Sequence, residues 1–305
     1  MLRVLAAREA RDFGVADFVR GFLIDQWRVS KFEPATDAVV AEHAGVAVGY
    51  AALFDEGAIA FVDPEHERQG AGGKLLSWVE GRALKARRTC HRQLVAGSNE
   101  RGHALLGGAG YRKVRSVIEM ARTLEPLPEP PPIPAGVRLD QLDLAADGRA
   151  VHAADAASFA GNADYREVSF QSFYDEHLSG PGLEPGFSRV ARRGDAIAGF
   201  TVCRRHPDDV GYVDLLAVDP NERGRGLGTA LLLTAFADFA SAGLREARLD
   251  VASDNPRGLR LYDRAGMTER VHIDVFEKRV DYVGKKAPMT ARAGPASAPR
   301  RFRAG

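Results

Sequence analysis

The hydrophobic positions in the second half of the chain change their period along the sequence, and each change predicts an element. Two short apolar runs flank Gly194-Asp195, a pair typical of tight turns, so residues 187–205 are expected to form a hairpin. Residues 210–219 form a further apolar run and predict the next strand. Within residues 227–239 the apolar side chains recur at steps of three and four, which is the period of a helix.

The remaining apolar runs give the same order of elements in both halves of the chain. In the second half they predict a strand, a short helix and a last strand over residues 247–253, 255–264 and 271–280. In the first half they predict a hairpin, a strand, a helix and two strands over residues 38–54, 58–63, 72–83, 92–97 and 116–123. Since strands and helices are packed together in each half, the pattern predicts an α+β layer structure.

One stretch of sequence occurs twice. "VDPEHERQGAGGKLL" begins at Val62 and "VDPNERGRGLGTALL" begins at Val218, which is 156 positions later. The same offset of 156 relates Gly110 to Gly266, so the register holds across nearly fifty residues. We therefore expect two copies of one fold, with the repeat as the domain.

Proline and small residues mark the expected boundaries of these copies. Residues 124–136 concentrate proline, which fits an extended connector and neither a helix interior nor a central strand. We therefore expect domains over residues 1–123 and 137–283. Residues 284–305 are small and basic with almost no large apolar side chains, which predicts a disordered tail.

Composition narrows the classes of partner. The 305 residues include 42 basic and 41 acidic side chains, a net charge of +1, so no global field attracts nucleic acid or an anionic membrane. No apolar stretch approaches the roughly 20 residues of a spanning helix. Cys90 and Cys203 lack the spacing of a disulfide framework or zinc site, and the start lacks a signal-peptide run. We expect a cytoplasmic protein, monomeric or homodimeric, without nucleic acid, membrane or metal.

The glycine-rich turn at residues 223–228 carries the first chemical signal. A strand, a glycine turn and a helix together can hold phosphate, because glycines allow close approach of backbone N–H groups and the helix start is partly positive. No lysine-serine or lysine-threonine pair follows, which argues against a P-loop. The preceding antiparallel hairpin argues against a dinucleotide fingerprint. A turn without a ligand remains the alternative.

The two motifs Arg223-x-x-Gly226-x-Gly228 and "NPRGLRLYDRAGM" (255–267) together resemble the GNAT superfamily of N-acetyltransferases. The resemblance covers most of residues 137–282 and, more weakly, residues 1–123. It implies two tandem GNAT-like domains, each with a mixed, mostly antiparallel sheet flanked by helices. The doubled arrangement is similar to the mycothiol synthases and related tandem enzymes of actinobacteria.

The resemblance also implies acetyl-CoA as the acyl donor. The arginine-glycine turn would hold its pyrophosphate, the strand before the turn would offer backbone groups to the pantetheine arm, and the strand near residues 249–252 would splay away to open a slot. Asn255 is expected chiefly to cap the short helix, with a donor contact as the second role. The implied donor-binding residues are Leu216, Ala217, Val218, Arg223, Gly224, Arg225, Gly226, Leu227, Gly228, Thr229 and Asn255.

Three residues are candidates for the chemistry of transfer. Tyr262 occupies the family position of the tyrosine that protonates the departing sulfur, and a core aromatic is its alternative role. Asp214 is a candidate base, since an acid in an apolar run is costly unless it is paired or functional; a surface position or a water relay are the alternatives. Strand alternation predicts Tyr212 beside Asp214 on one face, with Val213 and Leu215 on the other. Family relatives place a glutamate where this chain has Tyr212.

The first copy lacks each of these groups. At the offset of 156, Glu67 stands for Arg223, Ala58 for Asp214, and Leu106 for Tyr262. A glutamate would repel pyrophosphate, and neither alanine nor leucine transfers a proton. The first domain is therefore expected to be catalytically silent, and the second catalytic.

The remaining polar residues are less informative. His152, His177 and His206 have no metal-ligand spacing, and a surface position is favoured for them, as it is for Arg204. Aromatic residues within 158–178 are expected either to pack on the sheet or to line an acceptor pocket. The function expected is acetyl transfer to a primary amine of a small molecule. An acetyl-CoA-binding regulatory pseudo-enzyme and a protein N-acetyltransferase are the alternatives.

Overall fold

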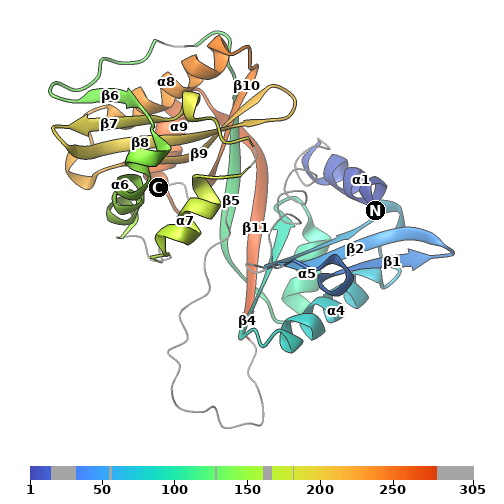
Figure 1. Cartoon of the computed structure of the whole chain (residues 1–305). Coiled ribbons are helices and arrows are strands. Elements are labelled where there is room, and N and C mark those ends of the chain that lie inside the picture. The colour runs from blue at the N-terminus through green and yellow to red at the C-terminus, as the bar shows by residue number, and fades with distance from the viewer. Residues whose placement is uncertain (15–31, 55–56, 128, 161–166, 181, 280–305) are drawn as a thin grey trace, which may run out of the picture. The chain divides into compact units, whose positions relative to one another are not determined.

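The structure is a computed structural model that describes the chain except residues 15–31, 55–56, 128, 161–166, 181 and 280–305. The expected disordered tail at 284–305 lies outside the described residues. Two compact units are present (Figure 1). The first unit contains Met1–Val117 and the segment that begins at Val271, and the second unit contains Ile118–Arg270.

The predicted order of elements in the first copy is confirmed. A glycine at φ 83° (Gly70) begins its long helix, and Asn99 caps the short one by accepting the Gly102 N–H at 2.9 Å. The described elements are α1 (Leu2–Phe13), α3 (Pro34–Asp37), β1 (Ala38–His43), β2 (Val46–Phe54), β3 (Gly57–Val62), a 3₁₀ turn (Pro64–His66), α4 (Ala71–Lys85), β4 (Cys90–Ala96), α5 (Glu100–Gly108) and β5 (Arg112–Thr123).

The second copy repeats this order, again as predicted. The hairpin turns at Gly194, whose φ is +59°, and the long helix stops just before Gly243, whose φ is +78°. The described elements are β6 (Arg138–Gln141), α6 (Leu144–Phe159), α7 (Phe170–His177), a 3₁₀ turn (Pro185–Phe187), β7 (Arg189–Arg193), β8 (Ala196–His206), β9 (Val210–Val218), a 3₁₀ turn (Pro220–Glu222), α8 (Leu227–Ser241), β10 (Glu246–Ala252), α9 (Pro256–Arg264) and β11 (Thr268–Arg279).

The last strand of each copy is exchanged. β11 comes from the end of the second copy, yet it pairs antiparallel with β4 in the first unit, from Ile273 opposite Ala96 to Arg279 opposite Cys90. The second half of β5, which comes from the first copy, lies beside β10 in the second unit. The compact units therefore differ from the contiguous domains expected from the sequence, because each is completed by a strand from the other copy.

Both sheets are mixed and mostly antiparallel, as predicted. In the first unit the order is β1-β2-β3-β4-β11 followed by the first half of β5. In the second unit it is the second half of β5 followed by β10-β9-β8-β7-β6. Parallel pairing joins β3 with β4 and β9 with β10.

The core of the second unit lies on both faces of its sheet. One cluster packs α8 and α9 against the sheet and includes Phe236, Phe239 and Leu249, all at most 1% exposed. The other packs α6 and α7 against the opposite face and includes Phe173 and Phe200, both 0% exposed. In Figure 1, α6 and α7 accordingly lie apart from α8. Together these clusters fix the two layers that flank β9.

Glycines in the repeated turn serve close packing as well as backbone conformation. A Cβ on Gly228 would meet Leu261 at 3.5 Å and Val218 at 3.6 Å. The first unit repeats this contact, because a Cβ on Gly72 would meet Leu105 at 3.2 Å. A side chain at Gly72 would therefore crowd Leu105, whereas the distances at Gly228 are those of ordinary van der Waals contact.

Candidate functional site

The glycine turn of the second unit begins α8 without any acidic or capping side chain. Gly226 is the N-cap residue at φ 84°, Gly224 has φ 76°, and neither a carboxylate nor a side-chain cap occurs in the first turn. The helix start therefore offers backbone N–H groups and a partial positive charge that no side chain of the helix satisfies. Leu227 is buried, whereas Thr229 is half-buried and lies in the same turn.

Arg223 holds the turn in place through its side chain. Its guanidinium donates to the Val218 carbonyl at 3.1 Å and to the Ser158 carbonyl at 2.7 Å, linking the turn to the end of β9 and to α6. Burial, and then the charge of Arg257, lower the pKa of Arg223. Arg225 is exposed, and its Nη1 lies 3.5 Å from Oε2 of Glu222. The turn therefore gathers several arginines, two of which repel each other.

The pairing between β9 and β10 ends well before the glycine turn. The parallel pairing of β10 with β9 covers only Glu246–Arg248 opposite Val210–Tyr212. Beyond those pairs, Leu216–Val218 of β9 and residues 249–252 of β10 do not pair with each other in the described chain. The backbone of β9 that leads into the glycine turn is therefore open toward β10. Leu216 and Ala217 themselves are buried, at 6% and 4% exposure.

A β-bulge at Asp214 interrupts the alternation of β9. Val202 pairs with Leu215 and Cys203 pairs with Val213, which leaves Asp214 without a partner on β8. Val213 packs in the cluster under α8, but Leu215 packs in the cluster under α6 and α7. The prediction that Val213 and Leu215 share a face is therefore wrong, because the extra residue shifts the period by one.

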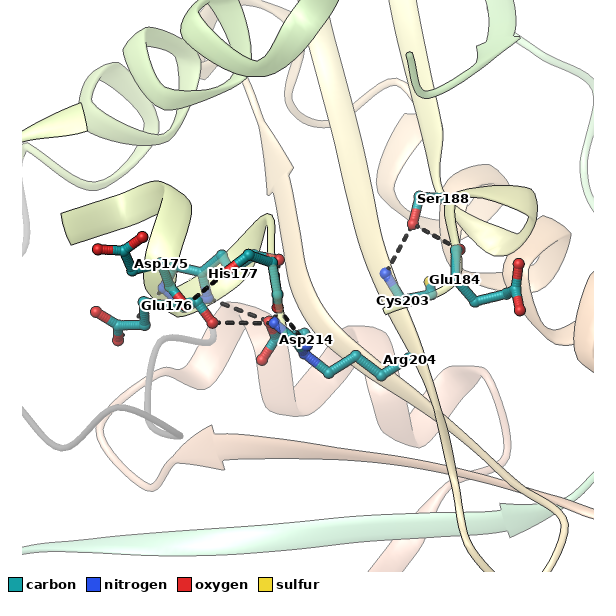
Figure 2. A network of polar contacts seen from close by, with 9 residues as sticks. Asp175, Glu176, His177, Glu184, Ser188, Cys203, Arg204 and Asp214 are labelled. Carbon is teal, nitrogen blue, oxygen red and sulfur yellow. Dashed lines mark hydrogen bonds and ion pairs between the residues drawn. The ribbon is translucent and has the colours of Figure 1, made fainter. Parts of the chain in front are cut away.

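Asp214 is joined to two cationic side chains (Figure 2). Its Oδ2 lies 3.2 Å from Nε of Arg204 and 3.2 Å from Nδ1 of His177. His177 also lies 3.4 Å, through Nε2, from Oε1 of Glu176. His177 is 1% exposed, and the side chain of Arg204 is 12% exposed. The surface positions predicted for His177 and Arg204 are therefore wrong, because both cations are paired with a carboxylate whose side chain is only 11% exposed.

The ion pairs determine the protonation of this network. Burial alone would raise the pKa of Asp214, but the charge of Arg204 and then of His177 lowers it to about 2. Burial alone would lower the pKa of His177, but the charge and hydrogen bond of Asp214, followed by Glu176, raise it to about 9. At neutral pH Asp214 is therefore an anion and His177 a cation.

Arg204 also caps a helix. Its guanidinium donates to the carbonyls of Glu176 at 2.9 Å, His177 at 3.1 Å and Ser179 at 3.0 Å, which lie at the carboxyl end of α7. A cation at this end satisfies unpaired carbonyls and complements the helix dipole. The bulge of β9 is thus connected through Arg204 to α7.

Tyr262 and Asn255 lie on α9 as expected. Asn255 caps the helix by accepting the Gly258 N–H at 3.0 Å, which confirms its predicted capping role. Tyr262 is 1% exposed, belongs to the core cluster under α8, and has a pKa raised by burial. A Cβ on Gly258 would approach Asn255 at 2.6 Å and Tyr262 at 3.3 Å. Gly258 therefore leaves room for both side chains.

Tyr212 is placed next to a histidine. It is 4% exposed, and its ring stacks on that of His206 with centroids 4.6 Å apart and planes 4° apart. The ring of His152 lies 3.0 Å, through Nε2, from the Val168 carbonyl. These two histidines therefore have intramolecular partners.

The packing role expected for aromatic residues within 158–178 is confirmed, and Phe170 and Tyr174 pack against the same core cluster. Phe159 and Phe173 are buried in the core at 4% and 0% exposure. Phe170 and Tyr174 line a pocket of about 400 Å³ with Arg149, whose guanidinium lies 4.4 Å from the Phe170 ring centroid. Tyr165 lies outside the described residues.

The first unit lacks the features that accompany the turn. β2 and β3 pair without interruption from Gly49 opposite Val62 to Phe54 opposite Gly57, so the position of Ala58 has no bulge. Leu106 is buried in an apolar cluster at 6% exposure. The described residues contain no group of three or more metal-ligating side chains and no helix long and apolar enough to cross a membrane.

The sequence is similar to known acetyltransferases. A profile of the acetyltransferase (GNAT) family matches residues 5–111 and 154–267. A mycothiol acetyltransferase of Actinosynnema mirum is 32% identical over 231 residues, which cover 73% of this chain and 77% of the relative. A mycothiol acetyltransferase of Kineococcus radiotolerans is 31% identical over 285 residues, which cover 89% of each chain.

Solved structures share the fold. A GCN5-related N-acetyltransferase from Sphaerobacter thermophilus superposes with a TM-score of 0.79 at 24% identity and covers 91% of both chains. A tandem GNAT protein from the clavulanic acid biosynthesis pathway superposes with a TM-score of 0.67 at 18% identity, covering 91% of this chain and 93% of that one. The tandem arrangement inferred from the repeat is thus also found in a solved protein.

Proposed function

Because the chain belongs to the GNAT family of acetyltransferases and is an N-acetyltransferase, we propose that its second unit transfers acetyl from acetyl-CoA to a primary amine of a small molecule. The observation that supports this most directly is the glycine turn at the start of α8, placed at the end of a strand that is open toward its neighbour. Such a turn suits a diphosphate, and such a strand suits an extended arm.

The proposed donor site lies where β9, no longer paired with β10, leads into the glycine turn. The N–H groups of Gly224–Thr229 bind the pyrophosphate, and the backbone of Leu216–Val218 binds the pantetheine arm. Arg223 and Arg257 lie close enough for the charge of Arg257 to lower the pKa of Arg223, and the charge of Asp219 opposes this only in part. An anionic ligand between them would relieve that repulsion. Asn255 serves the site by shaping the start of α9 beside Tyr262.

The proposed chemistry is direct attack. The neutral amine nitrogen forms a bond to the thioester carbonyl carbon, the bond from carbon to sulfur breaks, and the surplus amine proton passes to solvent. Tyr262 stays protonated because burial raises its pKa, and it donates a hydrogen bond and then its proton to the departing sulfur. Solvent returns a proton to Tyr262.

Asp214 fits a positioning role better than that of a base. A carboxylate whose pKa is about 2 is a weak acceptor for a proton from an ammonium group. Its ion pairs instead connect the bulge of β9 with α7. Tyr212 is stacked on His206, so it too has a packing role.

Substituting Tyr262 tests the proposed acid. We expect Tyr262→Phe to lower kcat by roughly 10²-fold or more while the affinity for acetyl-CoA is retained, since only the proton donor is removed. The measurement is CoA release over an amine panel that includes the amine precursor of mycothiol. Tyr111→Phe, a buried tyrosine of the first unit at 3% exposure, is the matched control and should leave kcat unchanged. Full activity of Tyr262→Phe would contradict the assignment.

Substituting Asp214 separates its two roles. If Asp214 anchors the bulge, Asp214→Asn should lower kcat by less than about tenfold and leave the shape of the pH–rate profile unchanged. If Asp214 is the base, kcat should fall by roughly 10²- to 10⁴-fold and the acidic limb of the profile should disappear. The profile is measured at saturating acetyl-CoA.

The acceptor is proposed from the relatives. Those named mycothiol acetyltransferases span most of this chain, so an amine precursor of mycothiol is the first acceptor to test. Acetyl-CoA binding without turnover on any small amine would favour the regulatory pseudo-enzyme. Turnover on peptide amines alone would favour a protein N-acetyltransferase.

A further inference from the structure

The first unit keeps the backbone of the glycine turn almost unchanged. Glu67 has φ −65° and ψ 160°, and Arg223 at the equivalent position has φ −66° and ψ 157°. Gly70 and Gly226 have φ of 83° and 84°, both with ψ of −4°. Within the turn of the first unit, Oδ1 of Asp63 accepts the backbone N–H of Glu65 at 3.1 Å. The turn of the first unit is therefore built for the same shape as that of the second.

The side chain in this turn nevertheless carries the opposite charge, since Glu67 stands where the second unit has Arg223, and it is neutralised by other side chains of the first unit. Glu67 forms ion pairs with Arg8 through Oε1 and with Arg101 through Oε2. Arg101 is the counterpart of Arg257 at the offset of 156. In the second unit Arg257 lies near Arg223, whereas in the first unit Arg101 forms an ion pair with Glu67.

Burial holds one side of this carboxylate firmly. The side chain of Arg8 is 7% exposed and that of Glu67 is 16% exposed, whereas that of Arg101 is 53% exposed. Arg8 comes from α1, where it also pairs with Asp12, and Arg101 comes from the first turn of α5. Two arginines from separate helices thus converge on one carboxylate beside the turn, which is the arrangement expected around a bound anion.

We propose that Glu67 is an internal replacement for the anionic ligand, so that the first unit is closed to phosphate esters and diphosphates while the carboxylate is in place. The choice of diphosphate rests on the donor site proposed for the second unit. Removing the charge at Glu67 should leave Arg8 and Arg101 beside an intact turn and so open an anion site that the wild-type chain masks.

The test compares how much inorganic pyrophosphate each variant binds in equilibrium dialysis. We expect the wild-type chain to bind one equivalent, and Glu67→Gln to bind one further equivalent per chain. Adding Arg101→Ala to Glu67→Gln should abolish the further equivalent, which locates it in the first unit. Glu65→Gln is the matched control, because Glu65 lies two residues away, is exposed, and should leave the binding unchanged.

Two results would overturn the proposal. One is a wild-type chain whose first unit already binds pyrophosphate, so that Arg101→Ala alone removes an equivalent. The other is a Glu67→Gln chain that gains no equivalent although its circular dichroism and melting temperature match the wild type. If Glu67→Gln is unstable, Glu67→Met provides the same neutralisation at similar volume. Acetyl transfer by the wild type tests the proposed function separately, since the gain at Glu67 does not depend on it.

Discussion

A carboxylate within an apolar strand can act as a base or as an anchor, and its partners decide between the two roles. The sequence identifies Asp214 as unusual because an acid stands in an apolar run, and Tyr262 by its place in a motif. It does not reveal Arg204 and His177 as partners, since neither has a sequence pattern that separates a paired cation from a solvated one. The pairing depends on how α7 meets β9, which is a tertiary property.

His177 makes the stability of the protein depend on alkaline pH. Its folded pKa of about 9 lies above the unfolded value of 6.5, so its stabilising contribution is complete below pH 6.5 and is lost as the pH rises through 9. A shift of this size corresponds to at most about 3 kcal/mol. We expect the unfolding free energy of the wild type to fall toward that of His177→Asn between pH 7 and 10.

Urea unfolding of the wild type and of His177→Asn at a series of pH values measures the difference between their unfolding free energies. His43→Gln provides the control, because His43 is exposed and should give a curve parallel to that of the wild type. A constant gap between the wild type and His177→Asn across this range would show that His177 is neutral in the folded state.

At the level of elements, the sequence predicts strands and helices well but misses the bulge. The run Val213 to Ala217 contains apolar residues on both sides of Asp214, so its period does not show where alternation breaks. The bulge matters because Asp214, the extra residue of β9, forms an ion pair with Arg204, and Arg204 in turn caps α7. A strand irregularity thereby fixes the end of a helix.

Replacing Arg204 tests this connection. We expect Arg204→Gln to destabilise the protein by roughly 2–4 kcal/mol, because it leaves the carboxylate of Asp214 with one partner fewer and the end of α7 uncapped. Thermal unfolding and hydrogen exchange of α7 measure the effect. Arg245→Gln is the control: its side chain is 77% exposed, its pair with Asp209 lies on the surface, and it should cost under about 0.5 kcal/mol. Equal effects of the two changes would contradict the anchoring role.

At the level of the whole molecule, the offset of 156 predicts the doubling, but it cannot predict the exchange of strands. β5 and β11 begin at Arg112 and Thr268 and end at Thr123 and Arg279, so the same offset relates them from end to end. Two equivalent strands have equivalent hydrophobic patterns, and either could complete either sheet. Only the structure shows that β11 pairs with β4.

The exchange predicts that neither half of the chain folds alone. Residues 1–123 lack β11 and residues 137–283 lack β5, so each fragment should give non-cooperative unfolding and rapid proteolysis. A full chain cut in the proline-rich segment after folding should remain assembled and keep its activity, because the cut removes no strand. Cooperative unfolding of an isolated half, measured by circular dichroism, would contradict this prediction.

The pairing of Cys90 with Arg279 also constrains synthesis. A ribosome delivers β4 long before β11, so the nascent first copy must wait, with β4 unpaired on that side, until β11 has emerged. We therefore expect premature termination anywhere upstream of β11 to release a product that chaperones retain or proteases remove, including a truncation that leaves the whole glycine turn of the second unit intact.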